Sequence, residues 1–252
     1  MPLDRSRRVR TPPALDLPPP YRLITLREVG DAFAHARSIA ADEGAGTLVY
    51  VGRFDLAEFA VVLEPDEPLR LARRAFYAGM VALADALAAH APPEKPMSID
   101  WPDAIRVDGG LIGGGRLAWP DGADENEPPQ WLVFGAMIRT VAMGEDEPGL
   151  RPLSSALEAE GFDDLGSGRL VESFARHLMV ATDAWQEKGF GEIAKSYLAR
   201  LAPAASGVRR ELVDNGDLRL RRMTVAEPES HALAQTLAQT PSWLDPATGG
   251  PK

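Results

Sequence analysis

The 252-residue chain has no cysteine and only four lysines. The lack of cysteine excludes disulfides and thiolate catalysis. It is also typical of a protein from a reducing compartment, which predicts a cytoplasmic location. Because the chain has only four lysines, nearly all of its basic charge comes from arginine. With a formal net charge of −10, the chain is not expected to be a general nucleic-acid binder.

Long apolar runs are also absent. No run approaches the ~20 residues that span a bilayer, so no membrane contact is predicted. Residues 1–20 are rich in arginine and proline and have no apolar centre. They are therefore not a signal peptide and are expected to form a disordered or extended tail. A hydrophobic content of 45% is ordinary for a soluble globular protein, and the length allows one full-sized core with a small appendage.

From residue 21 onwards the chain alternates between strand patterns and helix patterns. Apolar and β-branched runs predict strands at 21–26, 47–51, 58–64, 104–107 and 131–134. Helical spacing of apolar residues predicts helices at 27–41, 69–91, 169–185 and 192–201. We assign residues 21–202 to one domain. Residues 207–252 are assigned to a small C-terminal β-hairpin appendage and tail, with the hairpin at 207–225.

The chain is organised around the stretch from Ser98 to Leu117. A Trp-Pro-Asp turn opens it, a glycine-containing turn separates two short strands, and the second strand runs into Gly113-Gly114-Gly115. A glycine run exposes backbone without side chains, so a ligand can approach it closely. Beside Trp101 this indicates a small-molecule pocket. An ordinary hairpin with a glycine bulge explains the same spacing equally well.

This hairpin resembles the one in the biotin/lipoate protein ligase family. That family has Lys-Trp-Pro-Asn-Asp, a strand, Asp-Gly, two residues, an apolar residue, a small residue and Gly. The residues in register with this pattern are Trp101, Pro102, Asp103 (at the Asn position), Asp108, Gly109, Ile112, Gly113 and Gly114. Residues 46–49 match a Gly-Thr-apolar strand of the family, and Gly135 matches the first glycine of a later strand.

Two departures from the family pattern concern charge. The Lys before Trp is Asp100 here, and the Asp after Asn is Ala104. The family also has a long Gly/Arg-rich loop that clamps the acid and the phosphate of its acyl-adenylate. In this chain only Gly52–Asp55 joins the two strands, and Arg53 is the one cation in it. Because negative charge builds up when pyrophosphate leaves, adenylation needs a cation from elsewhere.

A further departure lies in the later strand. Met137 stands at the family's second glycine, and Arg139 stands at its Asn. A buried arginine needs an anion or a carboxylate partner. Arg139 therefore has two interpretations, a structural ion pair near the strand end or a contact with the adenylate.

The resemblance implies an α+β fold, with a mixed sheet and packed helices, and a function in post-translational modification. A carboxylic acid such as biotin or lipoate would be activated with ATP, with Mg, and passed to a lysine of a biotinyl or lipoyl carrier domain. The candidate cations are Arg139 and Arg53, with Arg106 and Arg116 as further ones. The implied ligand-binding residues are Trp101, Pro102, Asp103, Gly113, Gly114, Gly115 and Gly135. The alternative is a non-catalytic, degenerate relative that binds an acyl ligand or a carrier domain.

Other chemistries find little support in the sequence. The acidic loop at 121–130 contains no histidine, so we predict an exposed loop and no metal site. There is no nucleophile elbow and no Lys-Ser or Lys-Thr phosphate loop. The run GGLIGGG does not lead from a strand into a helix, so it is not a dinucleotide fingerprint.

Overall fold

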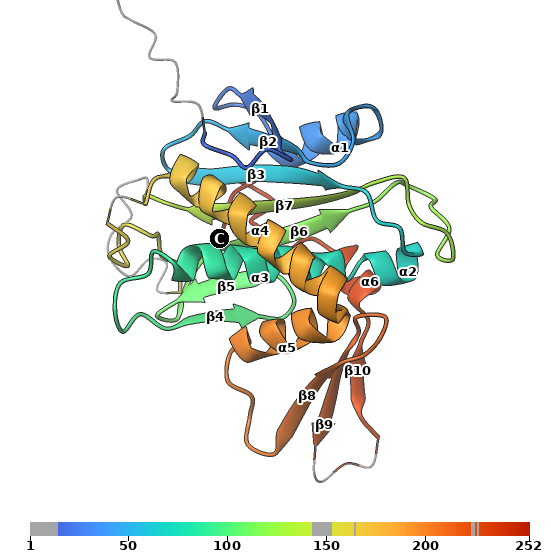
Figure 1. Ribbon diagram of the computed structural model, residues 1–252. Coiled ribbons are helices and arrows are strands. Elements are labelled where there is room, and N and C mark those ends of the chain that lie inside the picture. Colours follow the sequence, from blue (N-terminus) through green and yellow to red (C-terminus); the bar gives the residue numbers. More distant parts are fainter. Residues whose placement is uncertain (1–14, 143–152, 164, 223–224, 226) are drawn as a thin grey trace, which may run out of the picture.

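A seven-stranded mixed sheet forms the centre of the molecule (Figure 1). The computed structural model describes residues 15–142, 153–163, 165–222, 225 and 227–252. The strands lie in the order β1-β2-β3-β7-β6-β5-β4, with β1 and β2 parallel and the other neighbours antiparallel. Their bounds are β1 Arg22–Leu26, β2 Thr47–Val51, β3 Leu56–Leu63, β4 Met97–Asp100, β5 Ala104–Val107, β6 Gly110–Ala118 and β7 Leu132–Arg139. The predicted α+β class is confirmed.

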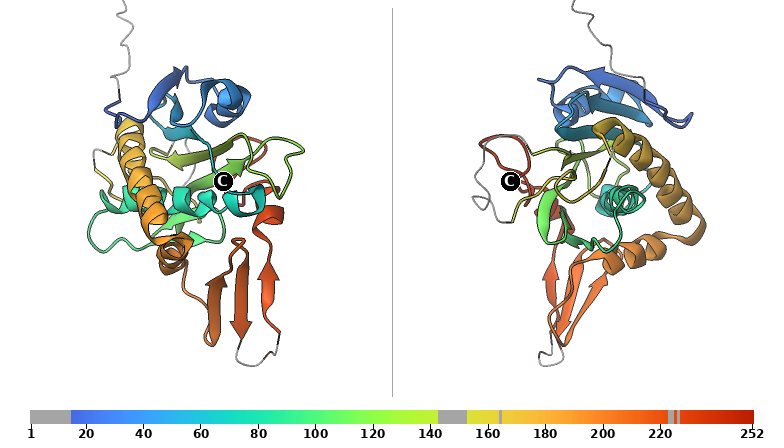
Figure 2. Two further views of the ribbon diagram at one scale, coloured as in Figure 1. Left: turned by 45° about the vertical axis from the view of Figure 1, so that its right-hand side comes forward. Right: turned by 90° about the vertical axis from the view of Figure 1, so that its left-hand side faces the viewer.

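Helices cover both faces of this sheet, as the two views of Figure 2 show. Helix α1 (Ala32–Glu43) packs on one face, against β2, β3 and β7, and we call this the α1 face. Helices α3 (Ala75–Ala88) and α4 (Ser167–Lys188) cover the opposite face, which we call the α3 face. Helix α5 (Phe190–Arg200) follows α4 and packs against both of them.

Two predicted helices differ in their bounds. Helix α1 begins at Ala32 instead of residue 27, because Asp31 caps it by accepting the Ala34 N–H at 2.9 Å. The predicted helix at 69–91 is split into α2 (Leu69–Ala72) and α3. The split falls at Arg73 and Arg74, whose buried side chains are held by ion pairs. Strand β4, which pairs with β5 at the sheet edge, was not predicted.

The largest part of the core lies between the sheet and the α3 face helices. The rings of Phe134 and Phe174 stack there with their centroids 5.7 Å apart. Helix α3 approaches β7 closely at Gly79, where an added Cβ would lie 2.4 Å from the Phe134 ring. A second cluster of small and branched residues fills the space beneath α1. The sheet is therefore buried on both faces, as the continuous apolar strands predict.

The chain beyond α5 first forms a small antiparallel sheet and then returns to the large one. The small sheet has the order β10-β9-β8, and its predicted hairpin is formed by β8 (Val208–Leu212) and β9 (Leu218–Arg222). After β10 (Glu229–His231) and α6 (Leu233–Leu237), residues 240–252 lie against the large sheet on the side away from α3 and α4 (Figure 2, right). We call residues 240–252 the return segment.

Some predictions fall partly or wholly outside the described residues. Most of the tail at 1–20 does, because the structure describes the chain only from residue 15. The boundary between the ligase-like domain and the appendage, at 202–207, stays a prediction. Within the described residues, no helix has the length and apolar character that crossing a membrane requires.

Candidate functional site

Gly114 lies at the centre of a row of residues that crosses the sheet. It pairs with Met137, which in turn pairs with Glu58. Side chains alternate between the faces of a strand, so residues two apart share a face. Arg116 on β6 and Arg139 on β7 are each two residues from this row. Both arginines therefore lie on the same face of the sheet as the row, which is the α1 face. Because β6 and β7 are antiparallel, Arg116 lies on one side of the row and Arg139 on the other.

The return segment covers this row with an indole. Trp243 is fully buried and packs in a cluster with Leu56, Ala104, Leu111 and Met137. Its Nε1–H donates to the carbonyl oxygen of Gly115 at 3.0 Å. A Cβ on Gly114 would lie 2.4 Å from Cδ1 of the indole. The bare backbone that the sequence predicts is present, and it is covered by the protein's own side chain.

The three consecutive glycines each have a packing reason. Gly113 has a φ of 142°, and a Cβ there would lie 1.9 Å from the Met137 carbonyl oxygen. A Cβ on Gly114 would lie 1.9 Å from the Asp103 carbonyl oxygen. Gly115 faces the other way, with Met80 Sδ 2.6 Å from its virtual Cβ. Close approach of backbone and side chains therefore accounts for the glycine run, and its ligand-binding role stays a prediction.

Asp103 is buried and holds the return segment. Its two carboxylate oxygens accept the backbone N–H of Ser242 at 3.0 Å and the Ser242 hydroxyl at 2.5 Å. Burial raises the pKa of the Asp103 carboxyl, and the bonds from Ser242 oppose that rise. The residue at the family's Asn position therefore anchors the segment that covers Gly114.

Trp101 does not border the same cleft as Gly114. Its Nε1–H donates to the Tyr77 hydroxyl at 3.2 Å, and its ring lies 5.6 Å from that of His231. Tyr77 belongs to α3 and to the core of the α3 face. The turn therefore directs the Trp101 indole to the side opposite the Gly114 row, which corrects the expectation of a shared pocket. The neighbouring Pro102 accepts the Tyr197 hydroxyl at 2.6 Å through its carbonyl oxygen.

Two of the candidate arginines are paired with carboxylates near them in sequence. Arg53 donates to the two carboxylate oxygens of Asp55 from Nε at 3.1 Å and from Nη2 at 2.6 Å. Arg106 Nε donates to Asp100 at 2.6 Å. Asp100, at the family's Lys position, is thus neutralised by a neighbour on the next strand.

Arg139 reaches the return segment. Its Nη2 donates to the Pro251 carbonyl oxygen at 2.7 Å and to a backbone oxygen of Lys252 at 3.3 Å, and its Nη1 donates to the Ser154 hydroxyl. In these bonds the guanidinium binds backbone oxygens of the return segment and a hydroxyl. Both interpretations made from sequence, a structural ion pair and a contact with the adenylate, stay predictions.

Arg116 is more deeply buried than Arg53 and Arg106. Its side chain is 15% exposed, its Nη2 lies 3.3 Å from Asp31 Oδ1, and its guanidinium lies 4.1 Å from the centre of the Phe33 ring. Its Nε–H is buried and has no acceptor among the residues that the structure describes. Burial lowers the pKa of Arg116, while Asp31 and Glu58 oppose that change. An unsatisfied buried donor on a cation favours the arrival of an anion.

Sequence reasoning missed Glu58, which lies on the same face. It is 3% exposed, and its Oε1 accepts the Ala32 N–H at the start of α1, at 2.9 Å. A carboxylate within the apolar run of β3 was the available signal. Burial raises the pKa of Glu58, and the bond from Ala32 and the charge of Arg116 lower it in part.

The raised pKa of Glu58 predicts a pH-dependent stability. Above its ordinary pKa of 4.5, the folded protein binds more protons at this site than the unfolded chain does. The free energy of unfolding therefore falls as pH rises from about 4.5 through the raised value. In Glu58→Gln, which keeps an acceptor for Ala32, we expect equal stability to wild type near pH 4 and a Tm a few degrees higher near pH 8. Thermal unfolding across this pH range checks it, and a difference in Tm that does not change with pH would contradict the assignment.

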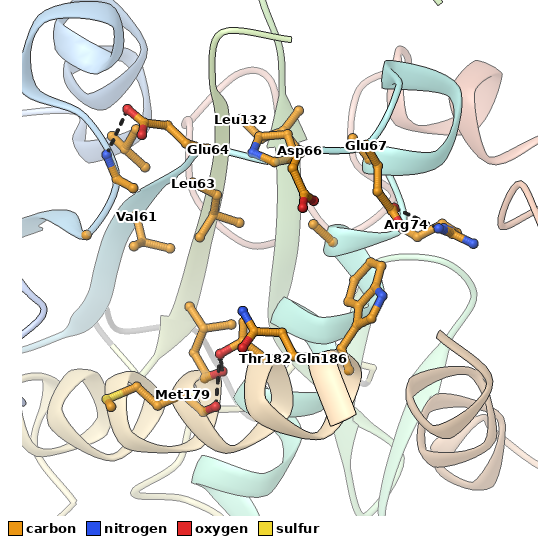
Figure 3. A pocket seen from close by; sticks show the side chains of 18 of the residues that line it. Val61, Leu63, Glu64, Asp66, Glu67, Arg74, Leu132, Met179, Thr182 and Gln186 are labelled. Carbon is orange, nitrogen blue, oxygen red and sulfur yellow. Dashed lines mark hydrogen bonds and ion pairs between the residues drawn. The ribbon is translucent and has the colours of Figure 1, made fainter. Parts of the chain in front are cut away.

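One large cavity lies away from the Gly114 row. It has a volume of about 900 Å³ and lies between the end of β3 and helix α4. Figure 3 shows Val61, Leu63 and Leu132 on its sheet side and Met179, Thr182 and Gln186 on α4. Its rim carries Glu64, Asp66, Glu67 and Asp183, and its one arginine, Arg74, is paired with Glu67 at 2.7 Å. Such a rim repels carboxylates and phosphates.

A smaller cavity, of about 360 Å³, lies on the α1 face. It is lined by Phe33 and Arg37 of α1, by Arg116 and by Pro241 of the return segment, among others. It is thus adjacent both to the buried cation and to the segment that covers Gly114. In the part of the chain that the structure describes, no three His, Asp or Glu side chains form a group that could hold a metal ion.

The sequence profile described as the biotin/lipoate A/B protein ligase family matches residues 17–199. No curated protein matches the chain.

Several solved structures are similar to this one. A biotin protein ligase-like protein of unknown function from Silicibacter sp. TM1040 is 28% identical, with a TM-score of 0.75, and the match covers 90% of this chain and 100% of that one. The biotin protein ligase from Aquifex aeolicus in complex with biotin and ATP is 15% identical (TM-score 0.60; 83% and 98% covered). The ligase from Leishmania major in complex with biotinyl-5-AMP is 16% identical (TM-score 0.52; 85% and 99% covered). The likeness to the last two shows a shared fold.

Proposed function

The chain belongs to the biotin/lipoate A/B protein ligase family, and from this membership we propose that it is a ligase-like protein acting on a carboxylic acid such as biotin or lipoate. The acid would bind on the α1 face beside Arg116, be activated with ATP, and be passed to a lysine of a carrier domain. We place this activity in the cytoplasm, in keeping with the lack of cysteine.

The observation that carries this proposal is the buried, unsatisfied Nε–H of Arg116 beside an open cavity on the α1 face. A carboxylate there would accept a charge-assisted hydrogen bond from a cation that already lies mostly out of water. Arg139 flanks the same row from the other direction. Its acceptors include backbone oxygens of Pro251 and Lys252, which a carboxylate or phosphate oxygen can replace.

The proposed reaction has two steps. A carboxylate oxygen of the acid bonds to the α-phosphorus of ATP, and pyrophosphate leaves. The lysine amine of the carrier then bonds to the acyl carbon, AMP leaves, and the amine proton passes to solvent. Arg116 and Arg139 would stabilise the negative charge that develops on the phosphate oxygens. Mg bound to ATP would supply the remaining positive charge.

The second candidate is a relative that binds an acyl ligand, or a carrier domain, without chemistry. This second candidate is supported by the lack of free positive charge at the other positions where the family resemblance suggests a cation. Asp100 replaces the family's Lys, and both Arg53 and Arg106 are already neutralised by carboxylates. In this case an acid binds with no dependence on ATP.

One experiment separates the two candidates. The full chain is titrated calorimetrically with biotin, lipoate and octanoate, each with and without Mg-ATP, and pyrophosphate release is measured in parallel. Under the ligase proposal we expect heat from an acid, heat from ATP and release of pyrophosphate. Binding of an acid without pyrophosphate supports the second candidate. If no acid binds to the wild type or to a Trp243→Ala variant, the ligase proposal is wrong, and of the second candidate only binding of a carrier domain is left.

A further inference from the structure

The return segment makes its contacts with the residues that the family resemblance marks as a ligand site. The Trp243 indole lies on Gly114 and its N–H bonds to Gly115, and Ser242 bonds to Asp103. Arg139 binds backbone oxygens of residues 251 and 252. A ligand on this face would use the same surface and the same polar partners.

A purely structural cover would not need these partners. A cap on an apolar sheet face can be entirely apolar, and burying an unneeded carboxylate or guanidinium is unfavourable. Here the covered surface includes a buried Asp103 and the partly buried Arg139, and the segment supplies a hydrogen bond to each. The surface beneath the segment therefore has the polar character of a binding site.

The segment itself is attached through few groups. Of residues 240–252, only Trp243 and Pro251 are buried. Several of its hydrogen bonds are internal, such as Lys252 Nζ to the Ser242 carbonyl oxygen at 2.6 Å and Asp245 N–H to that of Gly250 at 2.8 Å. It can thus leave the sheet as a preformed loop, with the loss of the buried contacts of Trp243 and Pro251. Its bonds to Asp103, Gly115, Arg139 and Ser154 are lost as well.

We infer that the return segment is an intramolecular competitor for the ligand of this site. This rests on the proposed function. The Trp243 indole, a flat ring with an N–H donor, occupies the place of the ligand's ring. Arg139 and Asp103 are held in place until the segment leaves. An acid that binds must first displace the indole, and the cavity of about 360 Å³ beside Pro241 would then extend over Gly114. The measured affinity is lowered by the fraction of molecules in which the segment is closed.

The test uses full-length point variants and biotin as the probe. Trp243→Ala removes the indole, and Ser242→Ala removes one anchor but keeps the indole. We expect biotin to bind about tenfold more tightly to Trp243→Ala than to wild type, and severalfold more tightly to Ser242→Ala. The matched control is Trp185→Ala, because Trp185 lines the cavity on the other face, and it should leave the affinity unchanged.

Hydrogen exchange gives a second readout in the wild-type chain. Biotin should speed exchange at the backbone N–H of Ser242, which is bonded to Asp103 at 3.0 Å and loses that acceptor when the segment leaves. If a folded Trp243→Ala and Ser242→Ala bind biotin no more tightly than wild type, the inference is wrong and the proposed function stands. The same holds if biotin slows exchange in the segment. If neither wild type nor either variant binds any acid, the proposed function is wrong and the inference with it.

Discussion

Gly114→Ala should lower the Tm by about 10 °C. The added methyl group would lie 1.9 Å from the Asp103 carbonyl oxygen and 2.4 Å from the Trp243 ring, so both the sheet edge and the return segment must move. The Asp103 oxygen also accepts the Gly115 N–H at 2.9 Å, which ties the backbone in place. Overpacking of this kind costs about 3 kcal/mol, which for a domain of this size corresponds to roughly 6–12 °C.

Gly191→Ala is the matched control for this substitution. Gly191 lies in α5, and nothing lies within 4 Å of an added Cβ. Alanine favours helix by about 0.5–1 kcal/mol relative to glycine, so the control should leave the Tm unchanged or raise it slightly. Thermal unfolding followed by circular dichroism makes the comparison. Equal melting temperatures in the two variants would show that the return segment does not pack closely enough on Gly114 to exclude a methyl group.

The hairpin that contains Gly114 could be predicted from the sequence, whereas its contact with Trp243 could not. The hairpin from Ser98 to Leu117 was predictable because its turns need glycine and its strands are short and local. The cover over it was not, because Trp243 is separated from its acceptor Gly115 by 128 residues. A single tryptophan in a polar stretch gives no periodic pattern that would show what it packs against.

The direction of Trp101 was also beyond the sequence. The residue lies in a turn, where the alternation of faces that orders a strand does not apply. Its contact with Tyr77 depends on how α3 and β10 pack around it. The ion pair of Arg106 with Asp100 follows from the register of β4 and β5. This register could not be predicted, because the sequence pattern did not show β4 as a strand. The charges of the site could therefore be listed from sequence but not paired.

Arg116→Gln should reduce the affinity for biotin or lipoate about a hundredfold. The variant removes the buried cation whose Nε–H lacks an acceptor, and a hydrogen bond to a charged group contributes up to about 3 kcal/mol. Calorimetry in the Trp243→Ala background measures the effect without competition from the return segment. Arg37→Gln is the control, because Arg37 lines the same cavity but is exposed. A comparable loss in both variants would mean that general charge, not this one guanidinium, attracts the acid.

The same substitution has a readout that needs no ligand. The charge of Arg116 lowers the pKa of Glu58, so its removal should raise that pKa further. Glu58 then stays protonated in the folded protein up to a higher pH. As pH rises above 4.5, the free energy of unfolding should therefore fall by more than it does in the wild type. Urea unfolding of Arg116→Gln at several pH values would show this. A pH dependence identical to that of the wild type would mean that Arg116 and Glu58 do not interact across the α1 face, and the case for a buried cation at this site would fail.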